Sequence, residues 1–108
     1  MASAELNGIL ITDMASFQAE SKRAFGFPES YGHTMDSWVD CMSYLRDDDG
    51  MSKFRLKPNE VLEIVVKDAA KMREQAPDLL EELTYCVAGI NERYEDYGEK
   101  PALVLKLA

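Results

Sequence analysis

The fold is decided near the middle of the chain by one apolar stretch, "EVLEIVVKD" at residues 60–68. Its run of aliphatic and β-branched side chains is typical of a strand that is buried on both faces. Shorter apolar runs lie toward the two ends of the chain, "AELNGILIT" at residues 4–12 and "ALVLKL" at residues 102–107. We therefore expect three strands, the first of them somewhere within residues 4–12.

The segments between these strands have the pattern of helices. "DMASFQAESKRAFG" predicts a helix over residues 14–25, with Asp13 as its N-cap and Gly26 at its end. Three more helices are expected: over residues 34–46, over residues 69–75, and from Asp78 to just before Gly98. Strands that alternate with helices predict an α/β fold, a small three-stranded parallel sheet covered by helices, in a single domain over residues 1–108.

Size and charge limit the possible functions. A chain of 108 residues is long enough for one domain with its own core. Its net charge of −8 speaks against nucleic acid or an anionic membrane as partner and favours a cationic one. No secretion signal is visible, and no apolar stretch approaches the ~18 residues of a membrane span. We expect a cytoplasmic protein in which Cys41 and Cys86 are reduced thiols in the core.

The expected second helix carries an unusual pair of carboxylates in "TMDSWVDCMSYLRDDD", residues 34–49. Asp36 and Asp40 are one turn apart, and no Lys or Arg within that turn neutralises them. On a helical wheel the acidic band also takes in Ser43 and Asp47, opposite an apolar stripe that contains Trp38. Like charges at this spacing destabilise a helix by a few tenths of a kcal/mol. The band is therefore either an ordinary solvated face or a binding surface.

The other residues argue against an enzyme or a metal site. His33 is the only histidine, and we interpret it as a turn residue, because no Ser or Cys nucleophile has a base at a recognisable spacing. A calcium loop centred on Gly50 would place Leu45 and Leu56 at ligand positions. We expect no catalytic residue, no metal and no cofactor, which leaves a cationic protein as the partner.

The stretch "FGFPESYGHTMDSWVDCMSYL", residues 25–45, resembles the barstar family, the intracellular inhibitors of barnase-like ribonucleases. The resemblance lies in the Pro28-x-x-Tyr31-Gly32 turn, the helix that follows it, the Asp36 and Asp40 pair and the cysteine after that pair. It extends over most of the chain. It implies a three-stranded parallel sheet with helices packed on it, in agreement with the pattern of strands and helices above.

The resemblance also implies a mechanism. A member of this family blocks the active site of a basic ribonuclease or toxin nuclease in bacteria, with no enzymatic activity of its own. Asp40 would take the place of a substrate phosphate, and Asp36 would pair with an adjacent basic residue. The free protein is expected to be a monomer. The candidate partner-binding residues are Ser30, Tyr31, Gly32, Thr34, Asp36, Val39, Asp40, Ser43, Tyr44 and Asp47.

The chain differs from the family where a partner would be selected. Ser30, Val39 and Leu45 stand where the family has aromatic residues, although Tyr44 flanks the acidic band. The acidic contact near the end of the family's last long helix has no clear counterpart, since counting back from Gly98 reaches Arg93. The target therefore need not be barnase. A barstar-like interaction module without a nuclease target remains the alternative.

Residues 46–59 form a long connection for so small a domain. They include three consecutive aspartates, Asp47 to Asp49, followed by Gly50, and resemble an insertion relative to the family. The connection is either a functional loop or a mobile one, and the composition of residues 46–54 favours a solvated, mobile segment. We expect Asp48 and Asp49 to affect the rate of association with a partner more than the rate of dissociation.

Overall fold

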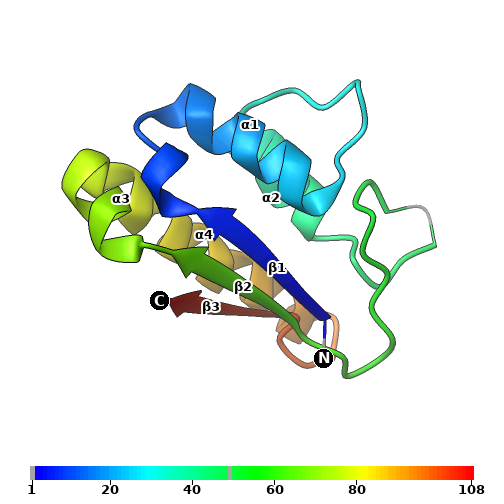
Figure 1. Ribbon diagram of the computed structural model, residues 1–108. Coiled ribbons are helices and arrows are strands. Elements are labelled where there is room, and N and C mark those ends of the chain that lie inside the picture. Colours follow the sequence, from blue (N-terminus) through cyan, green and yellow to red (C-terminus); the bar gives the residue numbers. More distant parts are fainter. Residues whose placement is uncertain (1, 49) are drawn as a thin grey trace.

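The protein is an α/β fold with one sheet and one layer of helices. The computed structural model describes residues 2–48 and 50–108, so Asp49 of the expected acidic loop lies outside the described residues. Three parallel strands, β1 (Ala2–Asn7), β2 (Leu62–Lys67) and β3 (Leu103–Leu107), form a sheet with β2 in the centre. The helices in the described part of the chain are α1 (Met14–Phe25), α2 (Met35–Met42), α3 (Ala69–Gln75), α4 (Pro77–Asp96) and the short 3-10 helix η1 (Gly8–Leu10). This arrangement confirms the expected fold class (Figure 1).

The sheet is covered on one face only. Side chains of Leu6, Ile64 and Leu103 are buried beneath the helices, with α1 along β1 and α4 along β3 (Figure 1). On the other face Val65 is buried at 8% exposure, Glu63 is half-buried and Lys67 is exposed. The expectation of a central strand buried on both faces therefore holds at Val65 and is wrong at Lys67. The reason is that α3 packs beside η1 at the end of the sheet and does not cross its second face (Figure 1).

The boundaries of α1 are those expected from the sequence. The Asp13 side chain accepts a hydrogen bond from the Ser16 amide at 2.8 Å, and the Ser16 hydroxyl accepts one from the Asp13 amide at 3.0 Å. At the other end Gly26 has a left-handed backbone with φ of 66°. The cap and the terminating glycine act locally, so sequence reasoning found both ends.

The first strand begins two residues before the window of residues 4–12 in which it was expected and ends inside that window. It occupies Ala2–Asn7 and stops there because the Asn7 side chain accepts a hydrogen bond from the Ile9 amide at 3.1 Å and starts η1. A Cβ on Gly8 would lie 2.4 Å from the Lys67 carbonyl oxygen, so glycine is needed where the chain leaves the sheet. Ile9 and Leu10, in the later part of the window, are half exposed on this turn.

The connection between α2 and β2 is attached to the body of the protein over part of its length. The Ser52 hydroxyl and the Lys53 amide both donate to the Phe25 carbonyl, at 2.7 and 2.8 Å. The Leu56 amide donates to the Leu45 carbonyl at 2.8 Å. The expectation of a solvated segment is wrong for the buried Ser52 and Leu56, while Asp47, Asp48 and Lys53 are exposed as expected.

Candidate functional site

The turn before α2 is held in place by Tyr31. Its ring is buried and packs on Phe27 at 4.6 Å between centroids, and its hydroxyl donates a hydrogen bond to Gln18 of α1. Burial raises the pKa of the Tyr31 hydroxyl well above its ordinary value, so the side chain is neutral. Of the expected partner-binding residues, Tyr31 can therefore contribute only backbone atoms to a contact surface.

The exposed part of this turn has a constrained backbone. Ser30, Gly32 and Thr34 are all exposed. A Cβ on Gly32 would lie 2.5 Å from the Ser37 hydroxyl, so a larger residue at this position would require that hydroxyl to move. His33 has φ of 55°, and its Nδ1 lies 2.9 Å from the Tyr31 carbonyl oxygen. The histidine is a turn residue, as expected from the sequence.

The rotation of α2 is fixed by its buried tryptophan. The Trp38 side chain is fully buried between the rings of Phe17 and Phe25, and its indole N–H donates to the Ser21 hydroxyl at 3.1 Å. Thr34 caps the helix by accepting a hydrogen bond from the Ser37 amide at 3.1 Å. These contacts leave the opposite face of α2 to the solvent.

That face carries the two aspartates expected from the helical wheel. Asp36 and Asp40 are exposed, while Val39 beside them is half-buried against the core. Burial raises the pKa of the Cys41 thiol, and the nearby Asp40 carboxylate raises it further. Burial likewise raises the pKa of the Cys86 thiol, and the Glu82 and Asp36 carboxylates raise it further. Both cysteines are free, and neither is a thiolate at neutral pH.

α2 is shorter than the sequence suggested. A helix over residues 34–46 was expected, but α2 ends at Met42, and the next residues form a turn. Within this turn Ser43 is half-buried, Tyr44 is about half exposed, and Asp47 is exposed. The three residues continue the acidic face of α2, although the wheel that grouped them does not apply beyond Met42.

Asp40 has a cationic neighbour that sequence reasoning missed. Arg93 Nη1 of α4 lies 4.0 Å from Asp40 Oδ1 and donates a hydrogen bond to the Ser43 hydroxyl at 3.3 Å. The sequence has no Lys or Arg within one helical turn of Asp40, but in the folded protein a cation from another helix lies beside it. Arg93 is visible in the sequence, but it can be assigned as the neighbour of Asp40 only when the packing of α4 against α2 is known.

A hollow of about 510 Å³ adjoins this pair. It lies between the turn after α2 and the end of α4, and its lining includes Tyr44, Asp47, Arg93, Asp96 and Tyr97. Tyr44 and Tyr97 are 48% and 85% exposed, so both offer aromatic area beside the acidic face.

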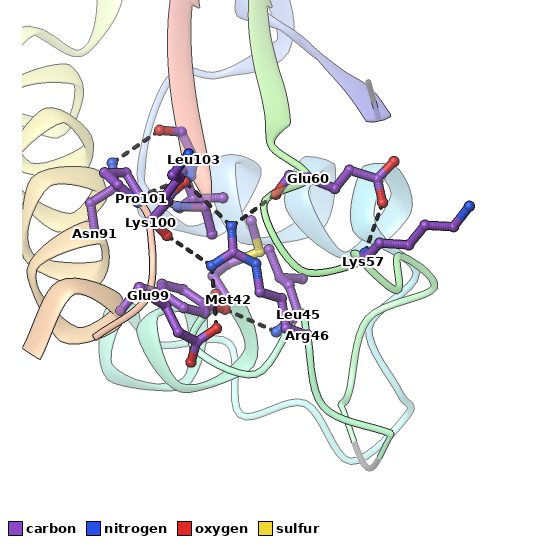
Figure 2. Close-up of polar contacts among 12 residues, drawn as sticks. Met42, Leu45, Arg46, Lys57, Glu60, Asn91, Glu99, Lys100, Pro101 and Leu103 are labelled. Carbon is purple, nitrogen blue, oxygen red and sulfur yellow. Dashed lines mark hydrogen bonds and ion pairs between the residues drawn. The ribbon is translucent and has the colours of Figure 1, made fainter. Parts of the chain in front are cut away.

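Arg46 is among the residues that line the hollow, and Figure 2 shows its polar contacts. Its side chain is only 7% exposed, and its guanidinium donates to the carbonyl oxygens of Glu60 and Lys100 at 3.0 and 2.8 Å. It also pairs with Glu99 at 3.3 Å and lies over the Tyr94 ring at 5.1 Å. Arg46 thus joins the turn after α2 to the segments that lead into β2 and β3. Its positive charge is paired with Glu99 within the fold.

Within residues 2–48 and 50–108, no group of three or more His, Cys, Asp or Glu side chains is placed to hold a metal ion. None of the helices described is long and apolar enough to cross a membrane. The turn at residues 30–34, the exposed face of α2 and the residues up to Asp47 follow one another in the chain, and we call them together the acidic surface.

One comparison with known protein families agrees with this fold. The family model described as barstar (barnase inhibitor) matches residues 1–106. The chain therefore belongs to the barstar family, whose members are inhibitors of barnase-type ribonucleases. No curated protein matches the chain.

Proposed function

We propose that this protein inhibits a basic ribonuclease of the barnase type by covering its active site with the acidic surface. The observation that carries the proposal is the exposure of Asp36 and Asp40 on a helix face whose direction is fixed by the buried Trp38. A ribonuclease active site is arranged to bind phosphates, so carboxylates held at a fixed spacing can occupy it in place of RNA.

Within this proposal the residues have different parts. Asp40 takes the place of a substrate phosphate among the cationic groups of the enzyme, and Asp36 pairs with a neighbouring basic side chain. Ser30, Gly32 and Thr34, with the backbone of Tyr31, contact the edge of the active site. Val39, Ser43, Tyr44 and Asp47 complete the contact on the side of α4.

The net charge of −8 supports the same partner class. Opposite net charges accelerate the encounter of two proteins, and the acceleration falls as salt screens the charges. Such an inhibitor acts by stoichiometric binding and has no catalytic turnover. In a bacterial cytoplasm it would act as an immunity protein against a toxin nuclease and would be a monomer until it meets that toxin.

A titration of RNA cleavage tests the proposal. Barnase is assayed on a fluorogenic RNA substrate with increasing amounts of the protein. We expect cleavage to fall to zero near one equivalent of wild type, and Asp40→Asn to require a large excess. Cleavage that stays constant with excess wild-type protein would exclude barnase as the target.

A second candidate function is a protein-interaction module on the barstar scaffold without a nuclease target. It is favoured by the positive charge of Arg93 beside Asp40, which reduces the net negative charge at the edge of the acidic surface. Affinity capture with the wild-type protein and with Asp40→Asn distinguishes the two. A protein that only wild type captures is purified and assayed for RNA cleavage, and the absence of that activity would favour the module.

A further inference from the structure

Arg93 stands at the edge of the acidic surface in an unusual position. Its side chain is 54% exposed, and its contacts within the described residues are the Ser43 hydroxyl at 3.3 Å and the Asp40 carboxylate at 4.0 Å. Both contacts are made by Nη1. Among the residues described, the Nε and Nη2 groups have no hydrogen-bond acceptor, although a guanidinium offers five N–H donors.

The pair does little for the fold. An ion pair with both side chains more than half exposed contributes ~0–1 kcal/mol to stability. Asp40 is itself 62% exposed, so solvent and salt reach both charges. A structural role therefore does not explain an arginine at this position.

The charge nevertheless alters what the surface can bind. Arg46, the other cation beside the hollow, is buried and engaged with backbone carbonyls, so it presents little charge to a partner. Arg93 is exposed at the same hollow, next to Asp40. A partner cation that approaches Asp40 from the α4 side meets a like charge within a few ångströms.

We propose that Arg93 is a specificity-determining residue: it lowers the affinity for ribonucleases that place a cationic side chain over the end of α4. The inference rests on the proposed function. A partner accepted by this surface brings its cations to Asp40 from the side of Asp36, and it leaves a neutral group or a hydrogen-bond acceptor opposite Arg93. At a separation of ~5 Å, one like-charge contact lowers affinity by about 4-fold at the dielectric constant of bulk water, and by more at the lower effective dielectric constant of a protein surface.

The test compares charge variants of Arg93 in binding to catalytically inactive barnase, measured by surface plasmon resonance at 50 and 300 mM salt. We expect Arg93→Gln to bind about tenfold more tightly than wild type at the lower salt, and Arg93→Glu more tightly still. Arg93→Lys keeps the charge and should bind like wild type. The gain should shrink at the higher salt because the charges are screened.

Arg73→Gln is the matched control. Arg73 is exposed on α3, at the opposite end of the molecule from the acidic surface (Figure 1). The Arg73→Gln substitution therefore removes the same charge without altering that surface. Its effect should stay within twofold. Thermal unfolding by circular dichroism is recorded for every variant, and each should melt within a few degrees of wild type.

The outcomes separate this inference from the proposed function. Tighter binding of barnase by Arg93→Gln than by wild type supports the inference. The same holds if Arg93→Gln binds measurably and wild type binds too weakly to measure. Equal or weaker binding by Arg93→Gln, in a series where the proteins do bind, overturns the inference and leaves the inhibitor function intact. An absence of binding by all variants, Arg93→Glu included, counts against a barnase-type target and removes the basis of both.

Discussion

The hydroxyl group of Tyr94 accepts a hydrogen bond from the backbone amide of Leu45 at 3.0 Å, across 49 positions of the chain. The same hydroxyl donates to the Met42 carbonyl at 3.1 Å. A side chain of α4 therefore satisfies backbone groups at the end of α2. This long-range contact explains why α2 stops at Met42 although the helical pattern of the sequence continues to Arg46.

Removing this hydroxyl should destabilise the protein. Tyr94→Phe keeps the ring against Arg46 but leaves the buried Leu45 amide without its acceptor, which costs ~1–3 kcal/mol. We expect that decrease in the free energy of unfolding, measured by urea titration. Tyr85→Phe, at a tyrosine of the same helix that is 72% exposed, should change it by less than ~0.5 kcal/mol. Equal effects of the two variants would contradict the role of Tyr94.

Asp40→Asn should separate binding from folding. It keeps the shape of the side chain but leaves cationic groups of the nuclease buried and unpaired, at a cost of ~2–5 kcal/mol, or roughly 30- to 4,000-fold in affinity. This range includes charge pairs of the barnase–barstar complex itself. The stability of the free protein should change by less than ~0.5 kcal/mol, because Asp40 is exposed. Normal binding would make the aspartate part of a solvated face, and an unfolded variant would make it structural.

Gly89→Ala should stabilise the free protein. Gly89 lies in the interior of α4, and a Cβ at this position would meet no other atom within 4 Å. Glycine in a helix interior is less favourable than alanine by ~0.8–1 kcal/mol. We expect a gain of about that size in urea titration. The reverse substitution at the exposed neighbour, Ala88→Gly, should destabilise the protein by a similar amount. If Gly89→Ala destabilised the protein, the added methyl group would have to clash with a neighbouring atom, which would contradict the open space at this position.

Glu20 should make stability depend on acid pH. Its carboxylate is 5% exposed and accepts two hydrogen bonds from Arg23 at 2.8 Å and one from the Asn7 amide at 2.6 Å. The bonds from Arg23 are the main cause that lowers the pKa of Glu20 below its ordinary value of 4.5, with a smaller contribution from Asn7, while burial opposes them. A lowered pKa in the folded state means that the stabilisation is complete above 4.5 and is lost as pH falls through the folded pKa.

Glu20→Gln isolates this contribution. The variant should be less stable than wild type at pH 7, and the difference should narrow as pH falls below about 4.5. Urea titrations at pH 7, 5, 4 and 3 measure it. A difference that is constant with pH would mean that the charge of Glu20 is not what stabilises the start of η1.

Sequence reasoning succeeded where structure is set by neighbouring residues. Asp13 and Gly26 delimit α1, and the residues on either side of α3 delimit that helix at 69–75. The period of α2 gave the exposed aspartates, because the burial of Trp38 obeys the same helical geometry. The family resemblance in the turn at residues 28–32 agrees with the family match over the whole chain.

It failed where residues far apart in the chain meet. The end of α2 depends on Tyr94, and the counter-charge of Asp40 is Arg93, both from a helix some fifty positions away. One face of the sheet is left uncovered because α3 packs beside η1, and the apolar run of β2 gives no information about the position of α3. Ser52 is buried because its hydroxyl donates a hydrogen bond to the Phe25 carbonyl oxygen, a contact between distant parts of the chain that the local composition does not indicate.

The burial of Trp38 has a practical consequence for fluorescence. It is the only tryptophan of the chain, and its ring lies between Phe17 and Phe25, behind the face that carries Asp36 and Asp40. Its emission should therefore be that of an indole shielded from water and should shift to longer wavelength on unfolding. Because a partner on the acidic surface does not touch this ring, a shift of its emission in a complex would report that α2 itself has moved.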